Sequence, residues 1–151
     1  MMLLLSLLLN ASLTIYTYNK LRLDGPTSLL NKSQFDIDKK RMRRGGDVIL
    51  VIDIDKFKVI NDTRGHAYGD TVIKDVADAM MRNLGRSDRA YRIGGDEFAI
   101  ISNNALGLKE RIQSSLNVPV SVGIGKTYEE ADENMYKEKK GLFGVYKNKT
   151  K

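Results

Sequence analysis

The sequence predicts an α+β fold, in which an apolar N-terminal helix precedes one domain ordered strand, helix, strand, strand, helix, strand. Two observations predict this class. Hydrophobic residues make up 42% of the 151 residues and charged residues 29%, which is enough for one packed core and excludes a largely disordered chain. Beyond residue 23, short apolar runs alternate with segments of helical period. We therefore expect residues 1–22 to form the apolar helix and residues 23–151 the domain.

Residues 1–19 carry no charge and form the first predicted element. A helix that spans a bilayer needs about 20 mainly apolar residues, and this segment reaches that length only by including Ser, Thr and Asn. Positive charge follows the segment, at Lys20 and Arg22, rather than preceding it as in a signal peptide. We therefore expect membrane contact through residues 1–19, with a cytoplasmic domain at the inner face of the cell membrane. A docking or dimerising helix is the alternative.

The next two elements are a helix and a buried strand. Ser33 is the expected N-cap of a helix that runs to about Arg44, where Gly45 and Gly46 would end it. The unbroken apolar run 48–52 predicts a strand covered on both faces.

The remaining elements complete the expected order. One helical stripe consists of Val72, Ile73, Val76, Ala79, Met80 and Leu84. A hairpin is expected from segments 89–93 and 97–101, which flank two glycines. A second helix is marked by Leu108, Ile112 and Leu116, and a last strand by Val120, Val122 and Ile124. This order, βαββαβ, is that of a ferredoxin-like fold.

Composition limits the chemistry that the chain can perform. The sequence has no cysteine and one histidine, which excludes disulfides, thiolate zinc sites and multi-histidine metal sites. Any metal must use oxygen ligands, which favours Mg²⁺, Mn²⁺ or Ca²⁺. The net charge of +6 is concentrated in residues 39–44 and 137–151. Such basic segments indicate a polyanion, a nucleotide phosphate or an anionic lipid, or else only solvated surfaces.

Two acidic motifs are the candidate site. Asp53 and Asp55 follow the buried strand, at the sheet edge where α/β folds bind ligands, although such a pair also occurs as a helix cap or on a surface. Asp96 and Glu97 follow Gly94-Gly95 at the expected hairpin tip, where the glycines would let a backbone or a ligand approach. If the hairpin lies beside the strand, Asp53 and Asp96 can share one Mg²⁺.

These motifs resemble a known family. The segment 92–98, Arg-Ile-Gly-Gly-Asp-Glu-Phe, resembles the signature of GGDEF-domain diguanylate cyclases, whose catalytic domain is a palm of the nucleotidyl cyclase type. Further segments resemble other motifs of the family in the same order: 24–32, 53–62, 65–70, 121–125 and 131–136.

The resemblance implies a role for each matching residue. Asp53, the Ile54 carbonyl and Asp96 would hold Mg²⁺ (or Mn²⁺) on the triphosphate of GTP, and Asp96 and Glu97 would be the catalytic carboxylates. The remaining substrate-binding residues would be Lys56, Phe57, Lys58 and Lys139 at the phosphates, Asn61 and Asp70 at the guanine, and His66, Gly94 and Gly95 around the pocket. A packing or loop-tethering role is the alternative for His66.

The resemblance also implies an activity and its partners. Two GTP molecules would be joined into cyclic di-GMP and two pyrophosphates across a transient homodimer, with no nucleic acid involved. Alternatives are a degenerate GTP-binding or docking module, and a compact palm-type cyclase that makes another cyclic dinucleotide.

The chain departs from the family pattern at several positions. The family's inhibitory product site begins with an Arg, whose position holds Gly85, while Asp88 is in place and Arg86 is displaced by one residue. The segment between Phe98 and Ser121 is shorter than usual, so we expect a trimmed hairpin or helix there. We also expect weak product inhibition.

Overall fold

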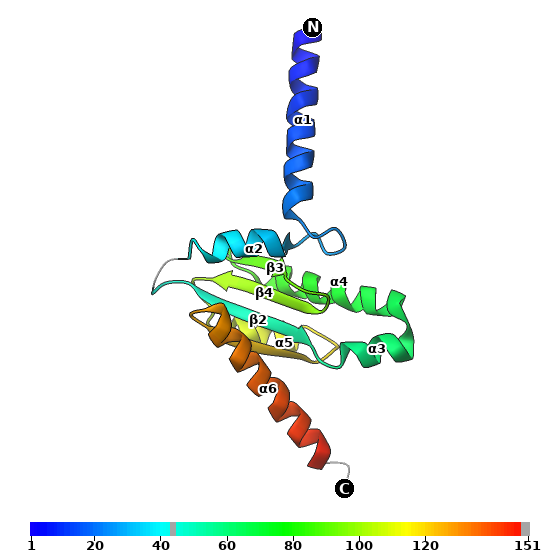
Figure 1. Ribbon diagram of the computed structural model, residues 1–151, viewed down its shortest axis with the longest axis vertical. Helices are drawn as coiled ribbons and strands as arrows, with labels where there is room; N and C mark the ends of the chain where they lie inside the picture. Colours follow the sequence, from blue (N-terminus) through cyan, green and yellow to red (C-terminus); the bar gives the residue numbers. More distant parts are fainter. Residues whose placement is uncertain (43–44, 149–151) are drawn as a thin grey trace.

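The computed structural model describes residues 1–42 and 45–148, and it contains one mixed sheet with helices on both faces (Figure 1). Helix α1 projects away from the sheet domain, which it meets only near its C-terminal end (Figure 1). The helices are α1 (Met2–Arg22), α2 (Lys32–Lys39), α3 (Phe57–Arg64), α4 (His66–Asn83), α5 (Leu108–Ser114) and α6 (Tyr128–Asn148). The strands are β1 (Leu30–Asn31), β2 (Val48–Ile54), β3 (Arg89–Arg92), β4 (Glu97–Ser102) and β5 (Val120–Gly125).

The strand order confirms the predicted ferredoxin-like fold. The sheet runs β1-β3-β4-β2-β5, with β2 antiparallel to both β4 and β5 and β3 antiparallel to β4. Leaving out β1, this is the order that a βαββαβ unit gives when its first and third strands lie at the centre. The short strand β1 extends the sheet by pairing in parallel with β3.

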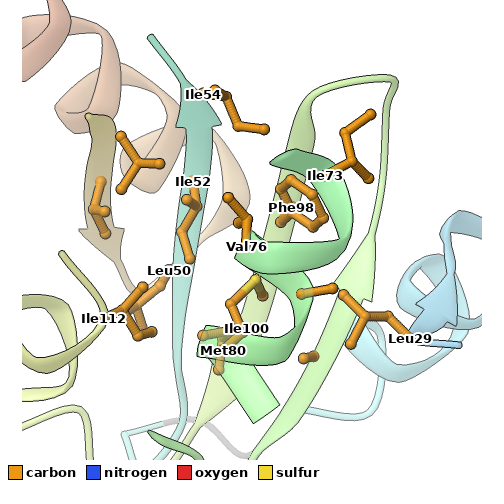
Figure 2. Packing of buried hydrophobic residues seen from close by; sticks show 14 of the residues in the cluster. Leu29, Leu50, Ile52, Ile54, Ile73, Val76, Met80, Phe98, Ile100 and Ile112 are labelled. Carbon is orange, nitrogen blue, oxygen red and sulfur yellow. The ribbon is translucent and has the colours of Figure 1, made fainter. Parts of the chain in front are cut away.

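Two layers of core residues cover the two faces of the sheet. On one face, Leu50 and Ile52 of β2 pack with Phe98 of β4 against Val76 and Met80 of α4 (Figure 2). The opposite face carries the alternate residues of β2, which pack with residues from α2 and α6. Six of the seven β2 residues are buried, so the expected strand with both faces covered is confirmed.

Helix α2 differs from the expectation at both ends. Its N-cap is Asn31 and not Ser33, because the Oδ1 atom of Asn31 accepts a hydrogen bond from the Gln34 amide at 3.0 Å. The helix ends at Lys39, and the Arg41 amide then donates to a carbonyl only three residues back. A run of like charges from Lys39 onward disfavours further helical turns. Arg43 and Arg44, which the expected helix included, lie outside the described residues.

Other boundaries also differ by a few residues. Leu84 and Leu116 follow the last residues of α4 and α5, yet both pack against the first core layer. The helical spacing of apolar residues therefore predicted correctly that Leu84 and Leu116 pack against the core, but it placed the ends of the two helices too late in the sequence. Strand β1 and helix α3 were not expected, since one is two residues long and the other has no fully buried residue.

Candidate functional site

The two acidic motifs meet where β2 ends and β4 begins. Asp53 and Glu97 are direct partners in the β2–β4 register, so their side chains lie on the same face of the sheet. The Ile54 amide donates to the Asp96 carbonyl at 3.2 Å, which joins the strand end to the hairpin. The hairpin therefore lies beside the Asp53 strand, as the proposed sharing of one cation requires.

Asp53 is an acidic group held inside the fold. It is 7% exposed, and the Lys139 ammonium from α6 donates to its Oδ1 atom. Burial raises the pKa of Asp53; the hydrogen bond from Lys139 opposes this rise, and the nearby charges of Asp96 and Asp55 add to it. The carboxylate thus lies in a site with a surplus of negative charge, and Lys139 supplies a cation there.

Glu97 and Asp55 belong to the same acidic group. Burial raises the pKa of Glu97, and the charges of Asp53 and Asp96 raise it further. Asp55 is equally buried, and its Oδ1 atom accepts a hydrogen bond from the Ser121 hydroxyl on β5 at 2.6 Å. Asp55 is therefore a structural carboxylate that ties the end of β2 to β5.

The donor set fits a hard divalent cation that the substrate helps to hold. Within residues 1–42 and 45–148, no three carboxylate or imidazole groups form a complete metal cage. Mg²⁺ is commonly held by one or two carboxylates, with substrate phosphates and water as its other ligands. Asp53 and Asp96, with the Ile54 carbonyl, would supply such a partial set.

Helix α3 begins directly beside this acidic group. Lys56, its N-cap, has a left-handed backbone conformation with φ of 56°, and the helix then starts at Phe57. The first amides of a helix have no partners within it and favour phosphate oxygens. Phe57 packs against the first core layer while Lys58 is exposed, so the segment presents amides and an ammonium group from a fixed position.

The residues predicted to bind guanine belong to two helices that pack against each other, with Asn61 on α3 and His66 and Asp70 on α4. The Oδ1 atom of Asn61 is buried without a hydrogen-bond partner among the described atoms. It lies so close to Gly69 that a Cβ atom there would be 1.9 Å away. Asp70, the next residue, is exposed, as is His66 at the start of α4. The Asn61 oxygen therefore packs against α4, whereas the exposed Asp70 carboxylate is accessible to a ligand.

The hairpin tip is fixed by a residue to which the sequence assigned no role. The Arg92 guanidinium donates to the Gly95 carbonyl at 2.8 Å and pairs with Asp24 at 3.2 Å. Asp24 also accepts the amide and hydroxyl protons of Thr27. The sequence offered one signal for this ion pair, since Asp24 and Arg92 are the oppositely charged first residues of the motifs 24–32 and 92–98. The two positions are 68 residues apart, so no local pattern joins them.

The two glycines of the tip have different surroundings. A Cβ atom at Gly95 would meet nothing within 4 Å, and one at Gly94 would meet the Glu97 side chain. The open space at Gly95 is compatible with a ligand beside the hairpin tip. In the loop before β3, Gly85 donates its amide proton to Asp88 at 2.7 Å, and Arg86 is exposed.

Of the described helices, only α1 is long and apolar enough to cross a membrane, by length and composition. The described side chains of α1 are exposed, except for Arg22 in the last turn, which is half-buried. Its apolar residues are spread around the whole helix rather than gathered on one side.

Comparison with known proteins places these features in a family context. A family model described as "Diguanylate cyclase, GGDEF domain" matches residues 22–122. The probable diguanylate cyclase DgcI of Escherichia coli (strain K12) is 34% identical over 142 residues, covering 82% of this chain and 32% of DgcI. Diguanylate cyclase DgcS of Shewanella oneidensis is 32% identical over 133 residues, covering 74% of this chain and 45% of DgcS. The chain thus spans less than half the length of these relatives.

Solved structures agree with this match. The GGDEF domain of DgcB from Caulobacter crescentus, solved in complex with c-di-GMP, has a TM-score of 0.71 and 30% identity. That comparison covers 80% of this chain and 91% of the DgcB domain. Diguanylate cyclase SiaD from Pseudomonas aeruginosa, solved with its activator SiaC, has a TM-score of 0.73 and 27% identity over 90% of this chain and 65% of SiaD.

Proposed function

We propose, from the premise that this chain belongs to the GGDEF-domain family of diguanylate cyclases, that it joins two GTP molecules into cyclic di-GMP and two pyrophosphates. The observation that carries the proposal is the direct pairing of Asp53 with Glu97, next to Asp96. A degenerate member that keeps only the fold has no need to retain this costly buried acidic group.

Each of the two bond-forming steps is a phosphoryl transfer. The 3′-oxygen of one GTP forms a bond to the α-phosphorus of the other, the bond from that phosphorus to the pyrophosphate oxygen breaks, and pyrophosphate leaves. The 3′-hydroxyl proton passes to a carboxylate of the Asp96–Glu97 pair. Burial raises the pKa of Glu97, which makes its carboxylate a stronger proton acceptor than that of an exposed glutamate.

Residues around the acidic group would hold the triphosphate. The amides at the start of α3, near Lys56 and Phe57, and the ammonium groups of Lys58 and Lys139 provide positive charge on the side of the site that a triphosphate would occupy. Mg²⁺, or Mn²⁺, bound with Asp53 and Asp96 would neutralise phosphate charge during the transfer. Positioning and charge neutralisation are the main contributions of a protein to this chemistry.

Guanine selectivity would come from the α3–α4 packing. Asp70 would accept hydrogen bonds from the N1–H and the exocyclic amine of guanine, while the Asn61 amide would meet its acceptor edge. His66 would shape the outer wall of this pocket. Burial of the Asn61 oxygen against Gly69 supports this assignment, because it fixes the amide and would leave its NH2 group to donate to the acceptor edge of guanine.

The assembly follows from the stoichiometry of the reaction. One such site holds one GTP, so two chains must face each other in a transient dimer. Helix α1 would anchor the chain in the cell membrane, with the sheet domain in the cytoplasm, because Lys20 and Arg22 lie at its domain end. Confinement to a surface raises the local concentration of a partner chain.

The test uses the full chain in detergent with Mg²⁺ and each nucleoside triphosphate, and it identifies products by mass spectrometry. We expect cyclic di-GMP from GTP alone, and none from an Asp53→Ala variant. GTP binding without product would indicate a degenerate module, and product from ATP would indicate another cyclic dinucleotide. Wild-type turnover by Asp53→Ala would refute the proposed cation site.

A further inference from the structure

A cleft of about 450 Å³ separates the C-terminal end of α1 from α2, away from the acidic site. Its wall contains one aromatic ring, Tyr18, and its polar lining is Arg22, Gln34, Asp38, Arg41 and Arg89. Three guanidinium groups thus face one carboxylate.

The single carboxylate of the cleft is already occupied. Asp38 is 5% exposed and accepts hydrogen bonds from Gln34 at 2.9 Å and from Tyr91 at 2.9 Å. It also pairs with Arg89 at 3.0 Å, and these donors hold the pKa of Asp38 below its usual value in spite of its burial. Asp38 therefore stays ionised and fixes the Arg89 guanidinium at the wall of the cleft.

Two further guanidinium groups remain in excess. Arg22 donates to the Gln34 side chain at 2.8 Å and lies over the Tyr18 ring at 4.6 Å, so its position is set by neutral partners. Arg41 is exposed and lines the cleft. The planar guanidinium group matches the oxygen atoms of a phosphate better than an ammonium group does. The cleft is therefore suited to a phosphate anion.

The position of the cleft indicates where that phosphate comes from. An α-helix of 21 residues is about 31 Å long, which matches a hydrocarbon layer of about 30 Å. The Thr14 and Thr17 hydroxyls donate to carbonyls of α1 at 2.8 Å, as a helix in lipid requires. Tyr16 and Tyr18 lie near the domain end, where aromatic residues meet lipid headgroups. The cleft would then lie at the headgroup level.

We propose that this cleft binds the phosphate group of an anionic phospholipid of the leaflet that faces the domain. This inference depends on the membrane anchoring proposed above. The lipid would bridge α1 and α2, with Arg22, Arg41 and Arg89 as the phosphate ligands. It would thereby fix the angle between the helix in the bilayer and the sheet domain, which α1 otherwise meets only near its end (Figure 1).

The test uses the full chain in neutral detergent, titrated with phosphatidylglycerol, phosphatidylcholine or inorganic phosphate, and counts bound lipid by native mass spectrometry. We expect a one-to-one adduct with phosphatidylglycerol that forms at lower concentration than with phosphatidylcholine. Arg41→Gln should weaken it about tenfold. Lys40→Gln is the matched control, since it removes the same charge from the exposed adjacent residue outside the cleft; it should weaken binding less than about threefold.

Three results would overturn the proposal. Equal losses in the two variants would mean diffuse attraction, equal binding of both lipids would mean no anionic site, and displacement of the lipid by an equal concentration of inorganic phosphate would mean a soluble-anion site. Cyclic di-GMP synthesis and resistance to alkaline carbonate extraction are measured on the same samples. An inactive or extractable chain contradicts the proposed function or its anchor, whereas an active, anchored chain without lipid preference contradicts this inference alone.

Discussion

Replacing Gly69 with alanine should damage guanine recognition while leaving the fold intact. A Cβ atom at this position of α4 would lie 1.9 Å from the Oδ1 atom and 3.0 Å from the Cγ atom of Asn61. It would also lie 3.2 Å from the Phe57 ring. The 1.9 Å contact cannot be tolerated, so the Asn61 amide must rotate away from the position that it holds between α3 and α4.

The cost of this substitution divides into two parts. Alanine gains about 1 kcal/mol over glycine inside a helix, whereas overpacking costs about 1 to 3 kcal/mol, so the net loss in free energy of unfolding is at most about 2 kcal/mol. Displacing Asn61 removes a hydrogen bond to the base, worth about 1 to 2 kcal/mol, or a five- to thirtyfold loss in kcat/KM for GTP. Gly141→Ala in α6 is the matched control, because a Cβ atom there meets nothing within 4 Å.

The assay compares kcat/KM for GTP and the thermal midpoint of the two variants with those of the unmodified chain. We expect Gly69→Ala to lose activity with a small fall in Tm, and Gly141→Ala to keep its activity with an unchanged or higher Tm. Unchanged kcat/KM in Gly69→Ala would show that Asn61 does not read the base. Equal losses in both variants would show that helix flexibility, and not the Asn61 amide, accounts for the effect.

Three further predictions concern charge, regulation and assembly. Asp53→Asn should abolish synthesis yet raise the Tm at pH 7. Burial raises the pKa of Asp53, so the ionised carboxylate opposes folding at a pH above that pKa. The increase in Tm should disappear as the pH falls through the pKa of Asp53 in the folded protein. Cyclic di-GMP added to the assay should leave the initial rate nearly unchanged, because Gly85 offers no guanidinium; strong inhibition that Arg86→Ala removes would contradict this. Removing residues 1–19 should make specific activity rise with protein concentration in the micromolar range, and a flat response down to nanomolar concentration would refute the anchoring role.

Much of the fold was predictable because burial leaves a periodic trace in the sequence. The run from Val48 to Ile52 and the stripe through Val76 and Met80 were assigned correctly because each apolar position faces a core layer. The predicted start of α2 was wrong because it depends on one side-chain hydrogen bond, from the Gln34 amide to Asn31, and not on periodicity. Helix α3 was not predicted, because it packs on α4 without a fully buried residue and so produces no clear apolar pattern in the sequence.

The acidic site was predictable only in part. Asp53 and Asp96 stand out as carboxylates at an expected strand end and hairpin tip, but their juxtaposition depended on a strand order that the sequence did not fix by itself. The pairing of Arg92 with Asp24 joins positions 68 residues apart, and that of Lys139 with Asp53 joins positions 86 apart. Such contacts follow from the finished packing, and no local pattern encodes them.

The contact between Lys139 and Asp53 shows how the packing arises from local residues. A Cβ atom at Gly123 of β5 would lie 1.9 Å from the Ala131 carbonyl oxygen, and one at Gly125 would lie 2.4 Å from the Ala131 amide nitrogen. These two glycines therefore let the backbone of α6 rest directly on the sheet beside β2. Only at that closeness does the Lys139 ammonium reach the Asp53 carboxylate and balance part of its charge. The glycines of β5 thus set the electrostatics of a site that they do not touch.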